Sequence, residues 1–594
     1  RTGAASLWLS TLAEKCESGE IIYDLRIKEN HAADEHKSHL LLVPSGELQR
    51  TVADDAQHTL PNFRQGDAIV LYERNADTDN VTNKMVFKGN IDYLNENEIC
   101  IRLRATQQNS SVLPSDSLYA IEHDAMDTTF RSMYQGLYAF MSATKERRDL
   151  LLFQREPQFD VALDKQIAEA ADDFTRIALK AKAAKDYFLL VGPPGTGKTS
   201  CALKKMVETF YKEEGAQILL LSYTNRAVDE ICKALSSIRP EVDFIRVGSE
   251  LSCDENYRDH LIENELATCM RRTEVCERIN RCRILVGTVA SISGKPELFR
   301  LKHFDVAIVD EATQILEPQL LGILCAKGEN GKEGVGKFIL IGDHKQLPAV
   351  VLQNTEQSEV YDEALSAVGL KNLKDSLFER LYRTARQHTD AHRTYDMLCR
   401  QGRMHPEVAL FANQAFYEGR LLPVGLPHQL EDSGNINRLS FYPSQPEPMG
   451  SSAKTNHSEA KIAARLAATV YKEHSEAFDA SRTLGIITPY RSQIALVKKE
   501  IEALGIPELN QILIDTVERF QGSERDVIIY SFCVNYPYQL KFLSNLTEED
   551  GILIDRKLNV ALTRARKQML LTGVPTLLER NPLYKSLLKL IEGS

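Results

Sequence analysis

Residues 185–200 read KDYFLLVGPPGTGKTS, an apolar run followed by a glycine- and proline-rich loop, a lysine and two hydroxyl residues. The run at 187–191 predicts a central parallel strand that is buried on both faces. The loop matches the pattern G-x-x-x-x-G-K-[ST], in which backbone N–H groups approach an anion, the lysine reaches the outer phosphates and the last hydroxyl binds Mg²⁺. A helix that begins near Lys198 points the positive end of its dipole at the same place. The alternative is a glycine-rich turn that happens to precede a helix. The predicted nucleotide-binding residues of this loop are Gly192, Pro193, Pro194, Gly195, Thr196, Gly197, Lys198 and Thr199.

A second apolar strand, within DVAIVDEATQ at 305–314, ends in two adjacent carboxylates. Burying such a pair is costly unless a cation compensates, and Mg²⁺ on nucleotide phosphates supplies one. We therefore expect Asp310 to bind the metal together with Thr199, and Glu311 to orient and activate the attacking water. Taken alone, the pair could also be the acidic first turn of a helix. The phosphate loop upstream favours the metal interpretation.

Two further segments carry candidate polar groups. FILIGDHKQLPAVV at 338–351 places Gln346 after a strand, where an amide can accept from water and donate to a terminal phosphate; an ordinary polar turn is the alternative. RKLNVALTRARKQMLL at 556–571 places Arg564 and Arg566 near the end of a predicted helix. Side chains at i and i+2 point in different directions, so we expect one arginine to reach phosphate and the other to brace the domain. A solvated basic face is the alternative.

Length and composition indicate an ordinary globular protein of several domains. The chain has 594 residues, 43% hydrophobic and 26% charged, and about three to four domains are expected from this length. No apolar run is long enough for a membrane span, and the first residues do not form a signal peptide. The first residue is arginine, which indicates either a trimmed terminus or a fragment from which an upstream nuclease or other domain is missing.

Charge and cysteine content place limits on partners and compartment. The net charge of −11 argues against a globally basic nucleic-acid binder but leaves a local cationic channel open. Eleven scattered cysteines are typical of a reducing compartment, so we expect the cytoplasm, with the nucleus as an alternative.

The order of apolar runs predicts an α/β protein. Short alternating runs such as EIIYDLRIK predict a barrel-like β domain over 1–125, and Met133, Leu137, Phe140 and Met141 recur at helical spacing within a stalk helix over 126–156. Strands and helices then alternate, as in parallel sheets covered on both faces. We expect the first α/β domain at 157–385 with a helical insertion at 249–282, the second at 386–594, and a long mobile surface segment at 423–457.

These segments resemble the superfamily-one helicases, in the branch that contains the nonsense-mediated-decay helicase and the Okazaki-fragment nuclease-helicase. The resemblance runs from about Asp160 to Val574 and implies two tandem RecA-like parallel-sheet domains preceded by a small β-barrel and a stalk helix. The motifs that carry it are GPPGTGKT (192–199), SYTNRAVDEI (222–231), DEATQ (310–314), GDHKQLPAVV (342–351), SLFERL (376–381), QGRMHPE (401–407), FYEGRL (416–421), ITPYRSQ (487–493), DTVERFQGSERDVII (515–529) and LNVALTRAR (558–566).

The resemblance assigns further residues to an ATP site. Gln166, in LDKQIAEA, matches the glutamine that reads the adenine edge, and Glu524 matches a ribose-side contact. Gln346 matches the γ-phosphate sensor. Arg403 and Arg564 match two arginine fingers of the second motor domain, which stabilise the charge that develops in phosphoryl transfer.

One position departs from the family. Gly402 stands where relatives usually have an aromatic residue that stacks on the nucleotide base. Stacking from this position is lost, which puts strict ATP preference in doubt, although another side chain could replace it.

The resemblance also implies a track for the nucleic-acid strand. Hydroxyls, amides and backbone N–H groups on such a track hold the sugar-phosphate backbone without reading sequence, so an acidic protein can still bind a strand. Hydroxyls that only cap helices after each strand are the alternative. The matching positions are Thr224, Asn225, Thr288, Pro489, Tyr490 and Thr516.

The leading hypothesis is an ATP- and Mg²⁺-dependent 5′-to-3′ translocase and helicase that acts on single-stranded nucleic acid as a monomer, with DNA expected first and RNA as the alternative. A second hypothesis is an ATP-dependent clamp or remodelling scaffold without processive unwinding, in which the barrel and 423–457 contact partners. A third is the motor half of a nuclease-helicase. No four-cysteine iron-sulfur pattern or nuclease carboxylate cluster is recognisable in the sequence.

Overall fold

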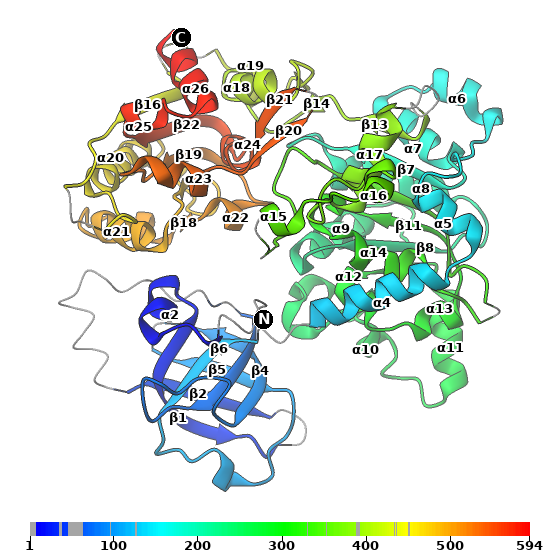
Figure 1. Cartoon of the computed structure of the whole chain (residues 1–594), viewed down its shortest axis with the longest axis horizontal. Coiled ribbons are helices and arrows are strands. Elements are labelled where there is room, and N and C mark those ends of the chain that lie inside the picture. The colour runs from blue at the N-terminus through cyan, green and yellow to red at the C-terminus, as the bar shows by residue number, and fades with distance from the viewer. Residues whose placement is uncertain are drawn as a thin grey trace.

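The structure is a computed structural model with three parts: a β-barrel, a first α/β domain and a second α/β domain (Figure 1). Within the part of the chain described, no helix has the length and apolar character needed to cross a membrane. The described residues are 8–34, 38–45, 63, 65–95, 97–124, 128–329, 331–351, 353, 355–387, 393–432, 434, 436–448, 452–549 and 551–593.

The N-terminal part is a closed antiparallel barrel with the strand order β1-β2-β5-β4-β3-β6. Closure pairs every strand with two neighbours and so leaves no exposed sheet edge. Inward-facing residues such as Leu40, Ile69 and Ile101 form its core, and α2 (Leu12–Ser18) precedes the first strand. The strands are β1 (Ile21–His31), β2 (His39–Pro44), β3 (Ala68–Glu73), β4 (Val86–Leu94), β5 (Ile99–Leu103) and β6 (Tyr119–His123).

The stalk consists of two helices, not one, so the prediction of a single long helix is wrong. α4 (Thr128–Ser142) ends before Thr144, whose side chain caps α5 (Lys145–Leu151). The packing face also differs from the expected one. Leu137 and Met141 are 43% and 70% exposed, whereas Gly136 lies against the backbone of Pro318 in α14 (Glu317–Leu324). The close approach of two helix backbones at a glycine therefore selects the buried face of α4.

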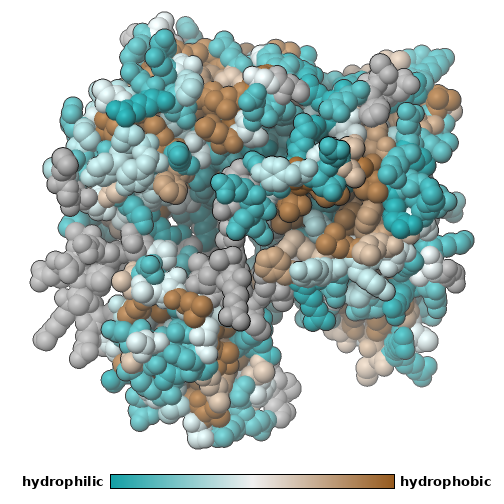
Figure 2. Space-filling model, viewed as in Figure 1, coloured by the Kyte–Doolittle hydropathy of each residue, from teal (hydrophilic) through white to brown (hydrophobic). Residues whose placement is uncertain are grey.

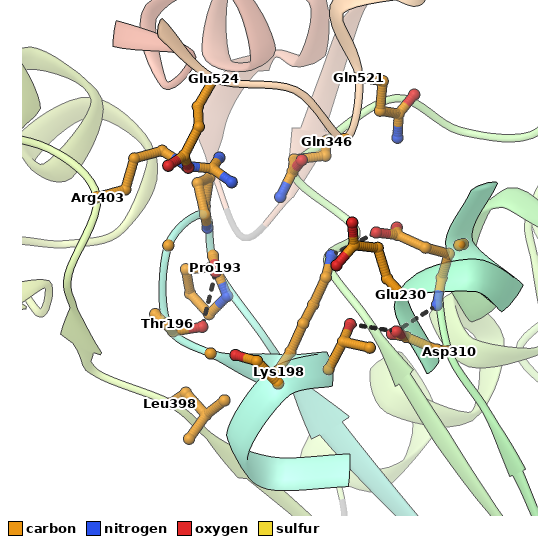
Figure 3. Close-up of a pocket in the computed structure, with 18 of the residues that line it drawn as sticks. Pro193, Thr196, Lys198, Glu230, Asp310, Gln346, Leu398, Arg403, Gln521 and Glu524 are labelled. Carbon is orange, nitrogen blue, oxygen red and sulfur yellow. Dashed lines mark hydrogen bonds and ion pairs between the residues drawn. The ribbon is translucent and has the colours of Figure 1, made fainter. Parts of the chain in front are cut away.

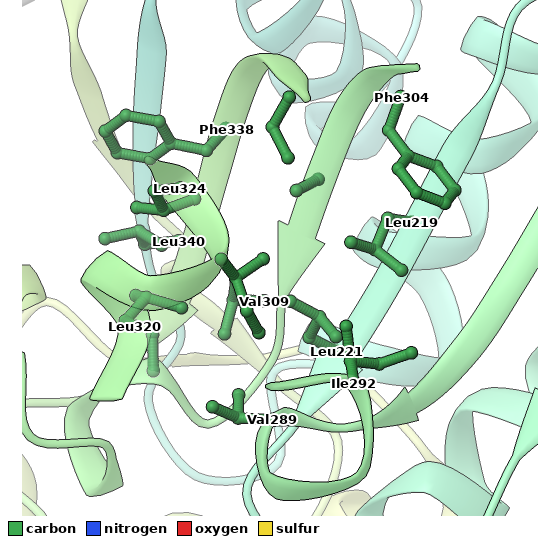
Figure 4. Close-up of a cluster of buried hydrophobic side chains, with 14 of the residues drawn as sticks. Leu219, Leu221, Val289, Ile292, Phe304, Val309, Leu320, Leu324, Phe338 and Leu340 are labelled. Carbon is green, nitrogen blue, oxygen red and sulfur yellow. The ribbon is translucent and has the colours of Figure 1, made fainter. Parts of the chain in front are cut away.

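The first α/β domain contains a seven-stranded sheet in the order β13-β7-β12-β11-β8-β10-β9, and each neighbouring pair is parallel. Alternate residues of each strand face opposite sides of the sheet. Leu219 and Leu221 belong to the hydrophobic cluster shown in Figure 4, and Leu220 belongs to the hydrophobic cluster on the other side. Burial of both faces explains the continuous apolar runs in the sequence. The strands are β7 (Tyr187–Val191), β8 (Ile218–Ser222), β9 (Phe244–Val247), β10 (Ile284–Thr288), β11 (Phe304–Val309), β12 (Val335–Gly342) and β13 (Tyr395–Met397).

β13 pairs with β7, so the first sheet continues to Met397. The expected boundary at 385/386 is therefore too early, because a three-residue strand has no detectable pattern of its own. The segment 249–282 contains short helices, as expected for the insertion. The helices of this domain are α6 (Asp164–Ala168), α7 (Asp173–Ala183), α8 (Lys204–Tyr211), α9 (Asn225–Ser236), α10 (Ile262–Glu265), α11 (Arg272–Arg281), α12 (Val289–Ser293), α13 (Glu297–Leu301), α14, α15 (Thr355–Ser358), α16 (Glu363–Ala367) and α17 (Leu377–Gln387).

The second α/β domain contains a parallel five-stranded sheet in the order β16-β22-β19-β17-β18. Hydrophobic clusters cover its two faces. Its strands are β16 (Leu439–Pro443), β17 (Leu484–Ile487), β18 (Leu513–Asp515), β19 (Arg525–Ser531) and β22 (Ala565–Gly573), and its helices are α18 (Pro406–Phe416), α19 (Pro427–Leu430), α20 (His457–Glu473), α21 (Arg491–Glu502), α22 (Val517–Phe520), α23 (Leu540–Leu543), α24 (Arg556–Leu562), α25 (Pro575–Leu578) and α26 (Pro582–Glu592).

The expectation of a long mobile surface segment at 423–457 is wrong for much of its described part. That part contains α19 and the edge strand β16, and His428, Gln429 and Asn456 are buried. Buried polar side chains, rather than apolar periodicity, hold this segment, which explains why its composition resembles that of a loop.

The predicted fold class, two parallel-sheet domains preceded by a small barrel and a stalk, is confirmed. Figure 2 shows that hydrophobic residues on this face of the molecule form separate patches among mostly hydrophilic ones.

Candidate active site

The phosphate loop, the acidic pair and Gln346 follow three neighbouring strands, β7, β11 and β12. Because the carboxyl ends of parallel strands meet at one edge of a sheet, these segments lie together. A cavity of about 1780 Å³ opens there, and residues of both α/β domains line it (Figure 3).

The phosphate loop is shaped by its own backbone and side chains. Gly195 and Gly197 have φ angles of +72° and +74°, which non-glycine residues rarely adopt, and the Thr196 hydroxyl donates to the Pro193 carbonyl across the loop at 2.7 Å. The expected helix does begin at Lys198, but its first residues, Lys198–Leu203, form a wider π-type turn before α8.

Lys198 reaches across the loop to Glu311, with 2.8 Å between Nζ and Oε1. Burial lowers the pKa of the Lys198 ammonium, but the Glu311 and Asp310 carboxylates outweigh burial and raise it above its usual value. The lysine is therefore a half-buried cation, paired with a carboxylate, at the mouth of the glycine loop. A phosphate oxygen is the kind of group that can take that carboxylate's place.

The two acids differ in their environments. Burial, followed by the neighbouring Glu311 charge, raises the pKa of Asp310 to about 6, and the Thr199 hydroxyl donates to its Oδ2. Burial also opposes ionisation of Glu311, yet Lys198 outweighs it and lowers the Glu311 pKa. Glu311 also has a φ of +54°, a strained conformation for a residue with a side chain. Glu311 is thus the more acidic member of the pair.

Asp310 and Thr199 fit a Mg²⁺ site because both present hard oxygen ligands beside the phosphate loop. A divalent cation there would offset the burial and the Glu311 charge that raise the pKa of Asp310.

Gln346 and Arg564 meet across the two domains. The Gln346 Nε2 donates to Asp343 Oδ2 at 2.8 Å, and its Oε1 accepts from an Arg564 guanidinium nitrogen at 3.4 Å. Arg564 is 2% exposed, and burial, with the nearby Arg403 charge, lowers its pKa to about 9. Arg566 instead lies 3.5 Å from Asp526 and 3.7 Å from Glu524, and unlike Arg564 it does not line the cavity.

Arg403 lines the same cavity from the second domain. Its Nε lies 2.5 Å from Glu524 Oε2. Burial raises the pKa of Glu524, but the Arg403 charge outweighs burial, and the net pKa is lowered. The preceding Gly402 N–H donates to the Gly195 carbonyl at 2.8 Å. The second domain therefore touches the phosphate loop through its backbone.

The surroundings of Gly402 explain its missing side chain. A Cβ at this position would lie 3.1 Å from Leu426 Cδ1 and 3.3 Å from Val424 Cγ2, and both residues line the cavity. These aliphatic groups occupy the space into which a larger side chain at 402 would project. Sequence reasoning missed Val424 and Leu426, since no motif or periodicity distinguishes them.

The structure does not bring Gln166 to the cavity. Its side chain is exposed on α6 and is absent from the cavity lining, which Ala170, Ala171 and Phe174 reach instead. The expected base-reading role is therefore not supported by its position. α6 is a single turn that ends before the chain reaches the cavity.

The predicted strand-binding residues lie after strands of both sheets, and several already have structural contacts. The Thr224 and Thr288 side chains cap α9 and α12, as the alternative interpretation expects. The Tyr490 hydroxyl accepts from Gln539 at 3.1 Å, and Asn225 is exposed. Pro489 and Thr516 are half-buried at the ends of β17 and β18. Strand binding by these six residues stays a prediction.

Comparison with known proteins identifies similar families and relatives over both α/β domains. The family description "AAA domain" matches residues 373–576 and, through a second family, residues 169–275 and 264–354. The predicted resemblance to superfamily-one helicases is confirmed.

Two curated relatives are similar over most of the chain. "DNA replication ATP-dependent helicase/nuclease DNA2" of Bos taurus is 27% identical over 98% of this chain and 54% of its own length. "DNA polymerase alpha-associated DNA helicase A" of Saccharomyces cerevisiae is 26% identical over 69% of this chain and 65% of its own length. The chain thus spans about half the length of the first relative. A solved complex of Arterivirus nonstructural protein 10 (helicase) with DNA is 16% identical, has a TM-score of 0.32, and covers 67% of this chain and 62% of its own.

Proposed function

We propose that this chain is the motor of an ATP-driven helicase that moves 5′ to 3′ along a single nucleic-acid strand, with DNA as the expected substrate. The observation that carries the proposal is the shared cavity. Lys198 reaches it from the first sheet, and Arg403 and Arg564 reach it from the second domain. Both halves of the site belong to one chain, so a monomer is sufficient.

The residues around the cavity fit hydrolysis of ATP with Mg²⁺. The metal, when bound, neutralises phosphate charge and is held by Thr199 and Asp310. Glu311 is ionised and can take a proton from water, while Gln346 orients that water and the phosphate. Buried guanidinium groups such as Arg564 stabilise developing negative charge more strongly than exposed ones.

Transport requires that nucleotide binding and release move the two domains relative to each other. The Gly402–Gly195 hydrogen bond and the Arg564–Gln346 contact both cross the boundary between the domains. Loss of the terminal phosphate would therefore change the contacts that hold the two domains together. Strand-holding residues after β8 and β10 and those after β17 and β18 would then change their separation.

The test is ATP hydrolysis with matched single-stranded DNA and RNA oligomers, followed by unwinding of duplexes with a 5′ or a 3′ tail. Wild type is expected to be stimulated by DNA and to open the 5′-tailed duplex. Lys198→Ala and Arg564→Ala are expected to be folded and inactive, whereas Lys205→Ala, on the exposed side of α8, is a matched control that keeps activity.

If single strands fail to raise hydrolysis in wild type, the motor proposal is rejected. Stimulation by RNA alone would assign RNA as the substrate. Tight ATP-dependent binding without strand separation would favour the clamp, and opening of only the 3′-tailed duplex would reverse the polarity.

A further inference from the structure

The segment 343–347 leaves the first sheet after β12 but packs into the second domain. Leu347 belongs to the hydrophobic core of that domain, together with Met404 and Phe416. The Lys345 ammonium donates to the Phe416 carbonyl at 2.7 Å. His344 Nε2 lies 2.9 Å from a carboxylate oxygen of Glu549 in β20 (Leu546–Glu549). The segment that carries Gln346 is therefore held by both domains.

Tyr417 lies at the centre of these contacts. Tyr417 is the first residue after α18, and it is 1% exposed. The hydroxyl donates to Asp343 Oδ2 at 2.7 Å and accepts from Asn559 Nδ2 at 2.8 Å. Asn559 also donates to the Lys345 carbonyl at 2.7 Å. One phenol thus joins the end of β12 to α24, which leads to Arg564.

The same Asp343 oxygen also accepts from Gln346 Nε2 at 2.8 Å. This bond fixes the amide, so that its other end, Oε1, faces Arg564. Burial, followed by the Asp343 charge, raises the pKa of Tyr417 well above its ordinary value, so the phenol stays protonated and continues to donate. Tyr417 therefore orients Gln346 through Asp343 without lining the cavity itself.

We propose that Tyr417 is a positioning residue for ATP hydrolysis, which holds Gln346 through Asp343 and ties that segment to the second domain. The inference rests on the proposed function. It predicts that loss of the hydroxyl oxygen of a buried tyrosine outside the cavity slows the chemical step while nucleotide binding is kept.

The test compares Tyr417→Phe with Tyr530→Phe. Tyr530 is equally buried in the same domain, but its hydroxyl has no hydrogen-bond partner among the described residues. For Tyr417→Phe we expect strand-stimulated kcat to fall about tenfold or more with KM for ATP within about twofold, because misplacement of a catalytic group costs turnover. Tyr530→Phe is expected to match wild type in both constants.

A double-mutant cycle separates positioning from general loss of structure. If Tyr417 acts through Gln346, Tyr417→Phe lowers kcat by less than about twofold in a Gln346→Ala background. A full effect in that background, or an unchanged kcat in the single variant, overturns the inference. If Tyr417→Phe does not fold, Asp343→Asn replaces it in the same cycle.

These outcomes are distinct from failure of the proposed function. Wild type without strand-stimulated hydrolysis rejects the motor itself. Wild-type activity together with an unaffected Tyr417→Phe variant rejects only the positioning role.

Discussion

Substitution of Gly195 by alanine tests whether the two domains must meet at the phosphate loop. A Cβ at Gly195 would lie 2.4 Å from Arg403 Cβ and 3.0 Å from the Arg403 nitrogen. Relief of that overlap needs a shift of about 1 Å, because carbon atoms in contact prefer at least 3.5 Å. The shift would also break the 2.8 Å hydrogen bond from Gly402 N–H to the Gly195 carbonyl.

Three costs act against the closed arrangement. Alanine in the left-handed conformation costs about 1 kcal/mol, the lost hydrogen bond about 1 kcal/mol, and the overlap about 1–3 kcal/mol. Together they are about 3–5 kcal/mol, which corresponds to a factor of about 10²–10⁴ in the population of the closed form. We expect strand-stimulated kcat to fall about 10²-fold, since a 1 Å displacement of a positioned group has this effect.

The assay is steady-state ATP hydrolysis with saturating single strand, together with small-angle scattering, which should show a larger radius of gyration for Gly195→Ala. Gly215→Ala is the matched control: its φ is +78°, but no atom lies within 4 Å of the added Cβ. It carries the backbone strain without the collision and should stay active. Full activity of Gly195→Ala, or equal losses in both variants, would refute the reasoning.

Three other substitutions are expected to act as follows. Burial raises the pKa of Glu459 to about 7, so ionisation of this carboxyl destabilises the fold increasingly as the pH rises from about 4.5 to 7. Glu459→Gln should therefore raise the free energy of unfolding by up to about 3 kcal/mol at pH 8 and change it little near pH 4.5. Urea denaturation at the two pH values measures this difference. Gly136→Ala should lower the melting temperature by several degrees, because its Cβ would lie 1.8 Å from the Pro318 carbonyl oxygen. Gly248→Ala is its control, because the added Cβ would meet only Arg246 Nε, at 3.9 Å. Leu426→Ala should raise KM for ATP, GTP and CTP alike by a few-fold, since an aliphatic contact does not distinguish bases; a change confined to ATP would contradict this.

Local sequence was sufficient where function depends on neighbouring residues. The strand, loop and helix of 185–200 are consecutive, so the shape of the proposed phosphate loop could be predicted directly, and the alternation of strands and helices predicted two parallel sheets. β13 and β16 were not predicted, because short edge strands lack a period long enough to detect. The exposed face of α4 was also not predictable, because a single glycine contact with α14 selects its buried side.

Tertiary structure alone decided which distant side chains meet. Nothing in the sequence near Tyr417 indicates that its hydroxyl lies 2.7 Å from Asp343, and nothing near Leu426 indicates contact with Gly402. Conversely, Gln166 fits a motif but lies outside the cavity. Patterns of neighbouring residues indicate which backbone conformation each segment favours. Such contacts join residues from separate elements and depend on how helices, strands and whole sheets pack against one another, which many side chains decide at once.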